Sequence, residues 1–283
     1  MKRLVILFSL LFILVSVVFS QEKVLDNAYL KCQYKHSYLK DTMDVATYDD
    51  LFILQIGKNI SKFYSYYTFQ ADSLVKTPDG DKVWKEIFNK SLEDFNRYRD
   101  KTRFLSSFPH ARSGTFVYKN YPKGEMTVTD GVVGEHGIYK DTLYAQRWQI
   151  SDSIKTVLGY MCQKAECDFR GRRWTVWFTP EVPVSDGPWK LGGLPGLIME
   201  AYDRGKQYYF IIVGLEQVED EPIVFSEPRS LRGKKFREVN RRELLKAKMD
   251  QLTNTASRME METGVPFGND KPVYRDLIER DYR

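Results

Sequence analysis

The sequence predicts a mainly β protein of the α+β class: a curved antiparallel sheet or half-barrel covered by one or more helices. Aromatic residues are abundant, with 18 Tyr and 17 Phe among 283 residues, and aromatic and β-branched side chains pack well on pleated surfaces. Short apolar segments bounded by turn residues recur along the chain, as is typical of strands and hairpins. One segment has a clear helical period instead, and such a helix must bury its apolar side against another layer.

The first 20 residues have the three-part layout of a secretory signal peptide. Lys2 and Arg3 supply the positive start, and an apolar run of 16 residues follows from Leu4 to Phe19. Because a bilayer-spanning helix needs about 20 such residues, we expect cleavage before Gln21 rather than a membrane anchor. No cysteine stands at the cleavage point, which argues against a lipid-anchored protein. We therefore expect an exported protein that is periplasmic, associated with the outer membrane, or secreted, with no transmembrane span in the mature chain.

The mature chain is expected to hold one β-rich domain and a tail. Loss of Lys2 and Arg3 lowers the formal charge from +5 to +3, which is too mild to predict binding of nucleic acid. Residues 21–228 are predicted to form the β-rich domain. Residues 229–283 are predicted to form a basic helical tail and an irregular C-terminus, because ten Lys or Arg between residues 229 and 258 face only three acids.

The first predicted elements are two strands and a further aromatic segment. Residues 28–38 and 50–56 are apolar and β-prone, and the second of them ends at Gly57. Residues 61–69 carry five aromatic side chains and are predicted as another strand, so that these segments form a hairpin.

The clearest helix is predicted from Asp81 to Arg99. Seven apolar residues fall on one face of this helix, and charged residues fill the other face. We expect the apolar face to pack on the sheet. A second helix is predicted from Asn240 to Asn254, with Asn240 as the N-cap and Glu243 three residues further on.

Strands resume between the two helices. A tight turn is predicted at Asp130-Gly131, another at Gly171-Arg172, and a Pro- and Gly-rich loop over residues 180–195. The predicted strands are residues 115–118, 126–129, 132–133, 143–150, 156–162, 167–170, 174–178, 197–202 and 208–215.

Three cysteines, Cys32, Cys162 and Cys167, leave two alternatives. If residues 162–167 form one extended strand, its two cysteines lie about 16 Å apart, whereas a disulfide needs Cα atoms within about 7 Å. One disulfide would therefore join Cys32 to Cys162 or Cys167. The favoured alternative is three buried free thiols, because cysteine packs as a small apolar side chain.

Signatures of catalysis and of metal binding are missing from the sequence. It contains no His-Glu-x-x-His, no Gly-x-Ser-x-Gly and no phosphate-binding loop. His36 lies near Asp41 and Asp44, but no pair of ligands has a standard spacing. We expect no catalytic residue that the sequence can name, no metal and no cofactor.

The most distinctive stretch runs from Asp186 to Ile198, with four Gly and two Pro in thirteen residues. Asp186, Trp189, Leu194 and Pro195 are its candidates for a rigid loop that lines a ligand-binding cleft. Glycine and proline first report backbone geometry, so a tightly packed crossover between strands is the favoured alternative.

Arg170, Arg172 and Trp177 complete the candidate ligand-binding set. The guanidinium groups of the two arginines would fit a carboxylate or a phosphate. Charged hairpin turns are common, so a solvated turn is the favoured alternative for this pair.

Residues 193–198 read Gly-Leu-Pro-Gly-Leu-Ile, and here the sequence resembles the GLPGLI family, exported proteins of Gram-negative bacteria. The other segments that carry the resemblance are Tyr34–Thr42, Ile56–Ser65, Leu158–Ala165, Phe169–Arg172, Trp177–Glu181 and Asp186–Trp189. The resemblance covers about residues 30–215. The basic tail beyond Ser230 matches least, and Cys167 stands where a small polar residue is expected, which puts in doubt any family-wide disulfide through it.

The resemblance implies an exported β-rich domain, and it implies no activity, substrate or catalytic residue. A looser similarity to periplasmic lipoprotein carriers implies a curved sheet, partly filled by helices, that holds an apolar ligand. This second similarity is one of fold, and a fold does not determine a function.

These observations predict a non-catalytic binding or carrier protein of the cell envelope, for an apolar ligand or a peptide. The aromatic content, the expected export and the missing catalytic signatures favour this function. One alternative is a structural or assembly component of an outer-membrane or transport complex, with an envelope protein as its partner. The other is an enzyme of unknown type, because catalytic sites assemble in space.

Overall fold

The computed structural model of the chain describes residues 23–39, 47–77, 79–98, 112–132, 135–227, 235–254 and 276–282. Its strands are β1 (Val24–Leu39), β2 (Thr47–Gly57), β3 (Ser61–Ser65), β4 (Phe116–Lys119), β5 (Glu125–Val132), β6 (Glu135–Thr142), β7 (Gln149–Val157), β8 (Tyr160–Phe169), β9 (Arg172–Thr179), β10 (Leu197–Asp203), β11 (Tyr208–Val224) and β12 (Arg237–Glu238). Its helices are α1 (Tyr66–Lys76), α2 (Gly80–Tyr98) and α4 (Arg241–Thr253).

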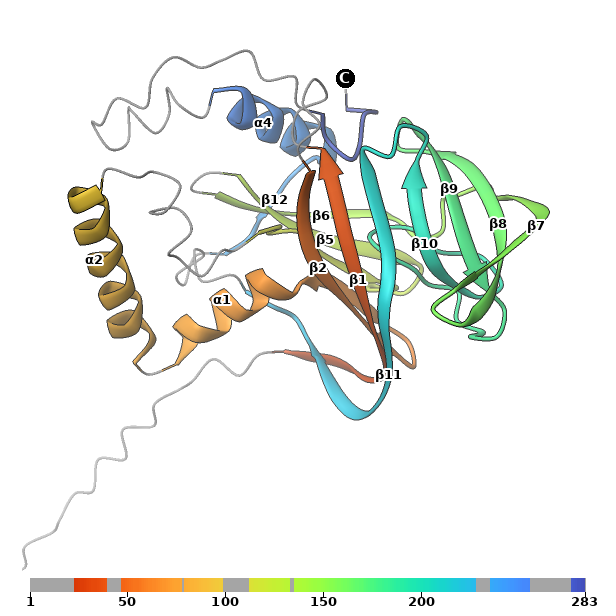
Figure 1. The fold of residues 1–283 in the computed structure, drawn as a ribbon, viewed down its shortest axis with the longest axis horizontal. Coiled ribbons are helices and arrows are strands. Elements are labelled where there is room, and N and C mark those ends of the chain that lie inside the picture. Colours follow the sequence, from red (N-terminus) through yellow and green to blue (C-terminus); the bar gives the residue numbers. More distant parts are fainter. Residues whose placement is uncertain are drawn as a thin grey trace, which may run out of the picture.

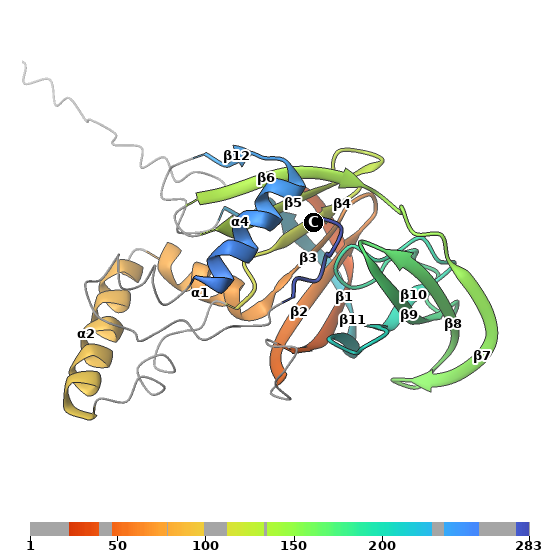
Figure 2. The same cartoon turned by 90° about the horizontal axis from the view of Figure 1, so that it is seen from above.

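The strands form one sheet in the order β12-β6-β5-β4-β3-β2-β1-β11-β10-β9-β8-β7 (Figure 1). Neighbouring strands are antiparallel except for the short parallel pair of β12 and β6. The sheet is open, and it curves around α4 so that one face is concave (Figure 2). The predicted fold class, a curved and mainly antiparallel sheet with helices, is confirmed.

Alternation along the central strands sends every second side chain to the concave face. On β1 these residues are Cys32, Tyr34 and His36, all of them buried. β1 lies between β2 and β11, and His36 is opposite Asp50 on one side and Phe210 on the other. Side chains directly opposite each other share a face. The concave face therefore holds the main apolar core together with ionisable groups.

A smaller apolar cluster lies on the opposite face of the sheet. Ile53, Tyr64, Phe116 and Tyr118 form it, and Phe69 of α1 packs against it. α1 therefore covers the outer side of β2 and β3.

The strand predicted over residues 61–69 is wrong beyond Ser65, where α1 begins. Ser65 is the N-cap of this helix, and its side chain accepts a hydrogen bond from the backbone NH of Thr68. A cap of this kind stabilises a helix start by about 1 kcal/mol. Local capping here outweighs the β preference of Tyr66, Tyr67 and Phe69.

Both predicted helices are present, but one of them lies elsewhere than expected. α2 spans Gly80–Tyr98 and contacts α1 beside the sheet, not on it (Figures 1 and 2). Phe88 and Leu92 remain 43% and 40% exposed. α4 begins after Asn240, whose side chain caps the helix by accepting from the NH of Arg242.

The tight turn predicted at Asp130-Gly131 is wrong, because β5 runs through both residues. Gly131 lies opposite His136 of β6, and a Cβ at this glycine would lie 3.2 Å from the histidine ring. Glycine at this position leaves space for the neighbouring histidine ring, and it does not form a turn.

Several later strand boundaries also differ from the prediction, two of them at residues with positive φ. The strand predicted over residues 143–150 starts only at Gln149, since Tyr144 has a positive φ of 53°. The strand predicted over residues 156–162 is interrupted by Leu158 and Gly159, both with positive φ, which form the turn between β7 and β8. Positive φ at both central residues is the geometry of a two-residue hairpin turn.

The concave face is covered by the loop over residues 180–196, by α4 and by residues 276–282, hereafter the C-terminal segment. The C-terminal segment is tied to the β8–β9 turn by a hydrogen bond of 2.9 Å from the NH of Arg280 to the carbonyl of Arg170. Within the described residues, none of the helices has both the length and the apolar character needed to cross a membrane. Residues 1–20 lie outside the described residues.

Candidate ligand-binding cavity

Between the concave face, α4 and the C-terminal segment, the described residues leave a cavity of about 370 Å³. Ligand pockets commonly measure about 300–1,000 Å³. Strands β1 to β6 and β11 contribute to the lining, as do residues 112–115, Trp189, one face of α4 and residues 276–279. The cavity is therefore assembled from segments that are far apart in the sequence.

Stacked rings from neighbouring strands form one wall of the cavity. His36 and Phe210 stack with their ring centroids 4.1 Å apart, and Phe52 and Phe63 stack at 4.6 Å. Tyr208 also stacks with His36, at 5.9 Å. Aromatic pairs of this kind contribute about 0.5–1.5 kcal/mol beyond the burial of their area, so these ring contacts stabilise the wall.

His36 adds a polar atom to the aromatic wall. It is 6% exposed, and its Nδ1 lies 3.0 Å from the carbonyl oxygen of Tyr209. A carbonyl only accepts, so Nδ1 carries the hydrogen. Burial lowers the pKa of His36 to about 4, and the neutral ring keeps Nε2 as an acceptor. No described residue donates to Nε2, and the His36 side chain is among those that line the cavity.

Asp50 contributes a carboxylate that is fully engaged by protein donors. It accepts from Ser65 Oγ at 2.9 Å and from the backbone NH groups of Leu51 and Ser113 at 2.8 and 3.2 Å. Burial raises the pKa of Asp50 against the opposing effect of these hydrogen bonds. The carboxylate is thus a structural link between β2, β3 and the segment before β4.

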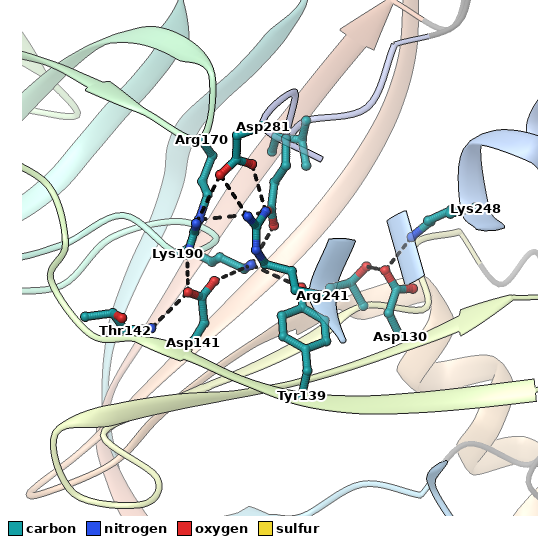
Figure 3. A network of polar contacts seen from close by, with 12 residues as sticks. Asp130, Tyr139, Asp141, Thr142, Arg170, Lys190, Arg241, Lys248 and Asp281 are labelled. Atoms are coloured by element: carbon teal, nitrogen blue, oxygen red, sulfur yellow. Dashed lines mark hydrogen bonds and ion pairs between the residues drawn. The ribbon is translucent and has the colours of Figure 1, made fainter. Parts of the chain in front are cut away.

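Asp130 contributes a second carboxylate, which ties α4 to the sheet. It accepts from Thr115 Oγ1 at 2.9 Å and from Lys248 Nζ at 2.5 Å (Figure 3). Leu245 and Leu252 lie on the same side of α4 as Lys248 and also line the cavity. The ion pair therefore holds the apolar face of α4 over the cavity.

Lys190 lies at the centre of a buried network at the edge of the cavity (Figure 3). Its Nζ donates to Asp141 at 2.8 Å, to Glu279 at 2.5 Å and to Tyr139 Oη at 3.1 Å. Burial acts to lower the pKa of Lys190, but Tyr139, Glu279 and Asp141 outweigh it and raise that pKa. Burial likewise acts to raise the pKa of Asp141, and Lys190 outweighs it. Both groups are therefore charged at pH 7.

Three arginines anchor the C-terminal segment to the rest of the protein. Arg241 of α4 donates twice to Asp281, at 2.8 Å each, and Arg170 donates to the same carboxylate at 3.1 Å. Arg172 is 3% exposed and donates to the carbonyl of Leu277 at 2.7 Å. These contacts and the Lys190 network fix residues 276–282 as a wall of the cavity.

Of the seven residues predicted to bind a ligand, one lines the cavity directly: Trp189. Arg170 and Arg172 do not line the cavity themselves, but they hold the C-terminal segment that forms one of its walls. They do not form a solvated turn, since they pair with carboxylates and carbonyl groups of the chain. Trp177 lies on the other face of β9, under Lys155 at 4.5 Å from its ring centroid.

The remaining three residues lie in the loop between β9 and β10. Asp186 is buried against Lys119 Nζ at 2.6 Å and Ser61 Oγ at 2.5 Å. Burial lowers the pKa of Lys119, although Asp186 acts in the opposite direction. Leu194 belongs to the main core, and Pro195 is exposed.

The geometry of this loop supports a packed crossover. Lys119 also donates to the carbonyl oxygens of Gly187 and Leu191, at 2.7 Å each. At Gly196, a Cβ would lie 2.1 Å from the carbonyl oxygen of Thr179. The glycine is therefore required by close backbone approach.

The three cysteines are buried and free. β11, β10 and β9 separate Cys32 on β1 from Cys162 and Cys167 on β8. The disulfide alternative is therefore absent from this structure, which has the three buried thiols. Within the described residues, no three His, Cys, Asp or Glu side chains gather to hold a metal ion. Asp41 and Asp44 lie outside those residues.

Sequence reasoning missed most of the cavity. The sequence suggests His36 only as a metal ligand, and it gives no signal that selects Asp50, Asp130, Phe210 or Lys248. The one available signal is period-two alternation, which places His36 and Phe210 on faces of predicted strands. Which face is concave depends on how twelve strands order themselves, and local sequence does not encode that order.

Comparisons with known proteins show a short family match and a distant structural likeness. A family model described as a protein of unknown function (Porph_ging) matches residues 169–200. This segment runs from the end of β8 into β10 and includes the hexapeptide at 193–198. No curated protein matches the chain.

Among solved structures, the chain is similar to PNGF-II in the space groups P21 and C2. Sequence identities are 12% and 14%, and TM-scores are 0.45 and 0.47. The matches cover 77% and 80% of this chain, and 32% and 33% of the PNGF-II chains. The chain thus spans about a third of the length of those solved chains.

Proposed function

We propose that this chain is an exported envelope protein that binds a small, largely apolar ligand in the cavity on the concave face of its sheet. The observation that carries the proposal is a cavity of about 370 Å³ walled by stacked aromatic rings. Ligand sites are typically concave and apolar, with a few placed polar groups. The expected signal peptide supports export, and mature protein recovered from the envelope with Gln21 at its N-terminus would be the direct test.

The carboxylates of the cavity favour binding over catalysis. Asp130 pairs with Lys248, Glu279 pairs with Lys190, and Asp50 is held by three donors. A catalytic base needs access to a substrate proton, and these groups are committed to protein partners. The short match at residues 169–200, which contains the Gly193–Ile198 hexapeptide, supports membership of the GLPGLI family.

A cavity-blocking variant tests the binding function. Gly114 is an exposed residue of the lining, and a Cβ there would have no heavy atom within 4 Å, so Gly114→Trp adds bulk at an exposed position of the lining without a built-in clash. We expect the neutral dye N-phenyl-1-naphthylamine to bind the mature protein with a rise in fluorescence. We expect Gly114→Trp to weaken that binding at least about tenfold, which is a loss of about 1.4 kcal/mol.

Gly205→Trp is the matched control, because Gly205 is exposed in the β10–β11 turn and its Cβ would meet only Gln207, at 3.6 Å. Equal melting temperatures of the variants would show that both fold. If the dye does not bind, or if both variants bind it as the parent does, the cavity is not the ligand site and the assembly role becomes the better explanation.

A further inference from the structure

The polar atoms that line the cavity differ in how many hydrogen bonds they make with other protein groups. The carboxylates of Asp50, Asp130 and Glu279 each accept from two or more donors of the protein. The hydroxyl of Tyr208 donates to the carbonyl of Asp276 at 2.6 Å. Nε2 of His36 differs, because no described residue donates to it and the His36 side chain lines the cavity.

The position of His36 in the aromatic wall fixes the orientation of its ring. Phe210 stacks on it at 4.1 Å with an interplanar angle of 13°, and Tyr38 stacks at 5.3 Å with an angle of 15°. The hydrogen bond from Nδ1 to the carbonyl of Tyr209 fixes the tautomer, with the hydrogen on Nδ1. Nε2 is therefore a preoriented acceptor within a wall of rings.

The charges around the cavity select against an ionic ligand. Three acids of the lining are matched by bases of the protein: Asp130 by Lys248, Glu279 by Lys190, and Asp276 by Arg172. Asp50 accepts from three hydrogen-bond donors, and Arg112, which also lines the cavity, is exposed and lies over the Tyr67 ring at 4.2 Å. A charged ligand would lose its hydration and would meet no buried counter-charge that is not already engaged, since Arg112 is exposed to solvent; burying an unpaired charge is costly. A neutral ligand carries no such penalty.

We propose that the ligand is a neutral molecule with a ring-sized apolar body and an O–H or N–H donor, which it donates to Nε2 of His36. This assignment rests on the proposed binding function and names the class of ligand that the cavity takes. The apolar body would pack against the Phe52, Phe63 and Phe210 rings, and the donor would satisfy the acceptor that the protein leaves open. A buried acceptor without a donor is unfavourable, so His36 also discriminates against ligands that lack the donor.

A pair of matched probes tests the hydrogen bond. 1-Naphthol and naphthalene share a two-ring body, are both neutral at pH 7, and differ by one hydroxyl. Their displacement of N-phenyl-1-naphthylamine gives the ratio of their affinities in the parent protein and in His36→Phe, which keeps a ring in the stack and removes the acceptor. A neutral hydrogen bond is worth about a twofold to tenfold change in affinity. We expect the ratio to shift by that factor towards naphthalene in His36→Phe.

His136→Phe is the matched control, since His136 is on β6 and does not line the cavity. We expect it to leave the affinity ratio unchanged. The same ratio in the parent protein and in a folded His36→Phe would overturn the proposed ligand class.

A measurement on the unaltered protein covers the case in which His36→Phe fails to fold. The chain has three histidines, so the imidazole nitrogen resonances can be assigned with ¹⁵N-labelled histidine. We expect 1-naphthol to move the Nε2 resonance of His36 upfield, in the direction of an accepted hydrogen bond, and naphthalene to leave it in place. A resonance that responds equally to both probes would contradict the hydrogen bond.

The outcomes separate the two proposals. If neither probe displaces the dye and Gly114→Trp has no effect, the binding function itself fails. If both probes bind in a way that Gly114→Trp blocks, but His36 does not distinguish them, the binding function stands and only the ligand class is wrong.

Discussion

His36 lies where β2, β1 and β11 run side by side, opposite Asp50 on one strand and Phe210 on the other. Its neighbours exclude water from the ring, and the carbonyl of Tyr209 accepts a hydrogen bond from the Nδ1–H group. Burial is the dominant effect on this group and lowers its pKa to about 4. The same burial that makes the ring part of the wall thus keeps it neutral and able to accept.

This lowered pKa predicts a dependence of stability on pH. The unfolded chain takes up a proton at His36 near pH 6.5, whereas the folded protein does so near pH 4. The stability that the neutral ring contributes is therefore complete above about pH 6.5 and is lost as pH falls towards 4. Between pH 7 and pH 5, we expect the difference in unfolding free energy between the parent protein and His36→Phe to fall by about 2 kcal/mol.

Urea unfolding of both proteins at the two pH values measures this difference. Other titrating groups, including Asp50 with its raised pKa, are common to both proteins and largely cancel in the comparison. A difference that stays constant between pH 7 and pH 5 would show that the folded protein binds a proton at His36 as readily as the unfolded chain.

The residues of the cavity show the limit of local sequence. Alternation predicted that Tyr34 and its neighbours lie on a strand, and the structure confirms this. The chemistry of His36 depends on residues 209 and 210, and no nearby sequence reports that contact. Trp189 was found because glycine and proline around it mark an unusual backbone, which is a local signal.

At the scale of elements, the loop between β9 and β10 shows what its glycines do. Gly196 brings the loop backbone against Thr179 at the end of β9, and Gly193 has a positive φ of 83°. Lys119 and Asp186 then fix the loop to β4. The glycines serve the packing of a crossover, and the side chain of Trp189 reaches the cavity as a result.

Substitution of a single glycine tests this interpretation. In Gly196→Ala, the added Cβ would lie 2.1 Å from a backbone oxygen that has no freedom to rotate away. Overpacking of this kind costs about 3 kcal/mol, so we expect a loss of that size in the unfolding free energy measured in urea. Gly205→Ala is the control, because its nearest neighbour would be 3.6 Å away, and we expect a change within about 0.5 kcal/mol. Similar small effects at both positions would mean that the loop relaxes freely.

Strands and helices were predicted best where one signal acted alone. The period of residues 81–99 and the cap at Asn240 both gave helices that the structure confirms. The prediction was wrong where two signals competed, as at residues 61–69, where aromatic β preference met the capping side chain of Ser65. It was also wrong at residues 143–150, because Tyr144 adopts a conformation that tyrosine rarely prefers.

At the scale of the whole molecule, the C-terminal segment completes the concave face. Its acids pair with cations from four other parts of the chain: Lys190 in the loop, Arg170 after β8, Arg172 in β9 and Arg241 in α4. Figure 3 shows Lys190, Arg170 and Arg241. Sequence reasoning predicted the basic helix but not its partners. The sequence does not show that Asp141 and Glu279 are the acidic partners of Lys190, because these residues are far apart along the chain and meet only in the folded protein.

Removal of the charges from this segment tests its role. In the double variant Glu279→Gln and Asp281→Asn, the shape of both side chains is kept and the cations lose partners. Breaking a buried ion pair costs about 3–5 kcal/mol, so we expect a loss of that size in the unfolding free energy, together with weaker binding of the dye. Asp168→Asn is the control: its carboxylate pairs with Arg173 but is 78% exposed, and we expect its unfolding free energy to match that of the parent protein. Comparable losses in both proteins would argue that the segment is not an integral wall.

The position of β1 in the middle of the sheet also constrains when the protein becomes folded. Cys32 on β1 lies opposite Leu215 on β11, so the central seam joins stretches made early and late in synthesis. Local hairpins on either side can pair as they appear, but the seam needs closure of a very long loop, and such closures slow folding. A nascent chain therefore stays unfolded enough to pass through a narrow channel until β11 has been made. It becomes fully compact only after most of its length has emerged.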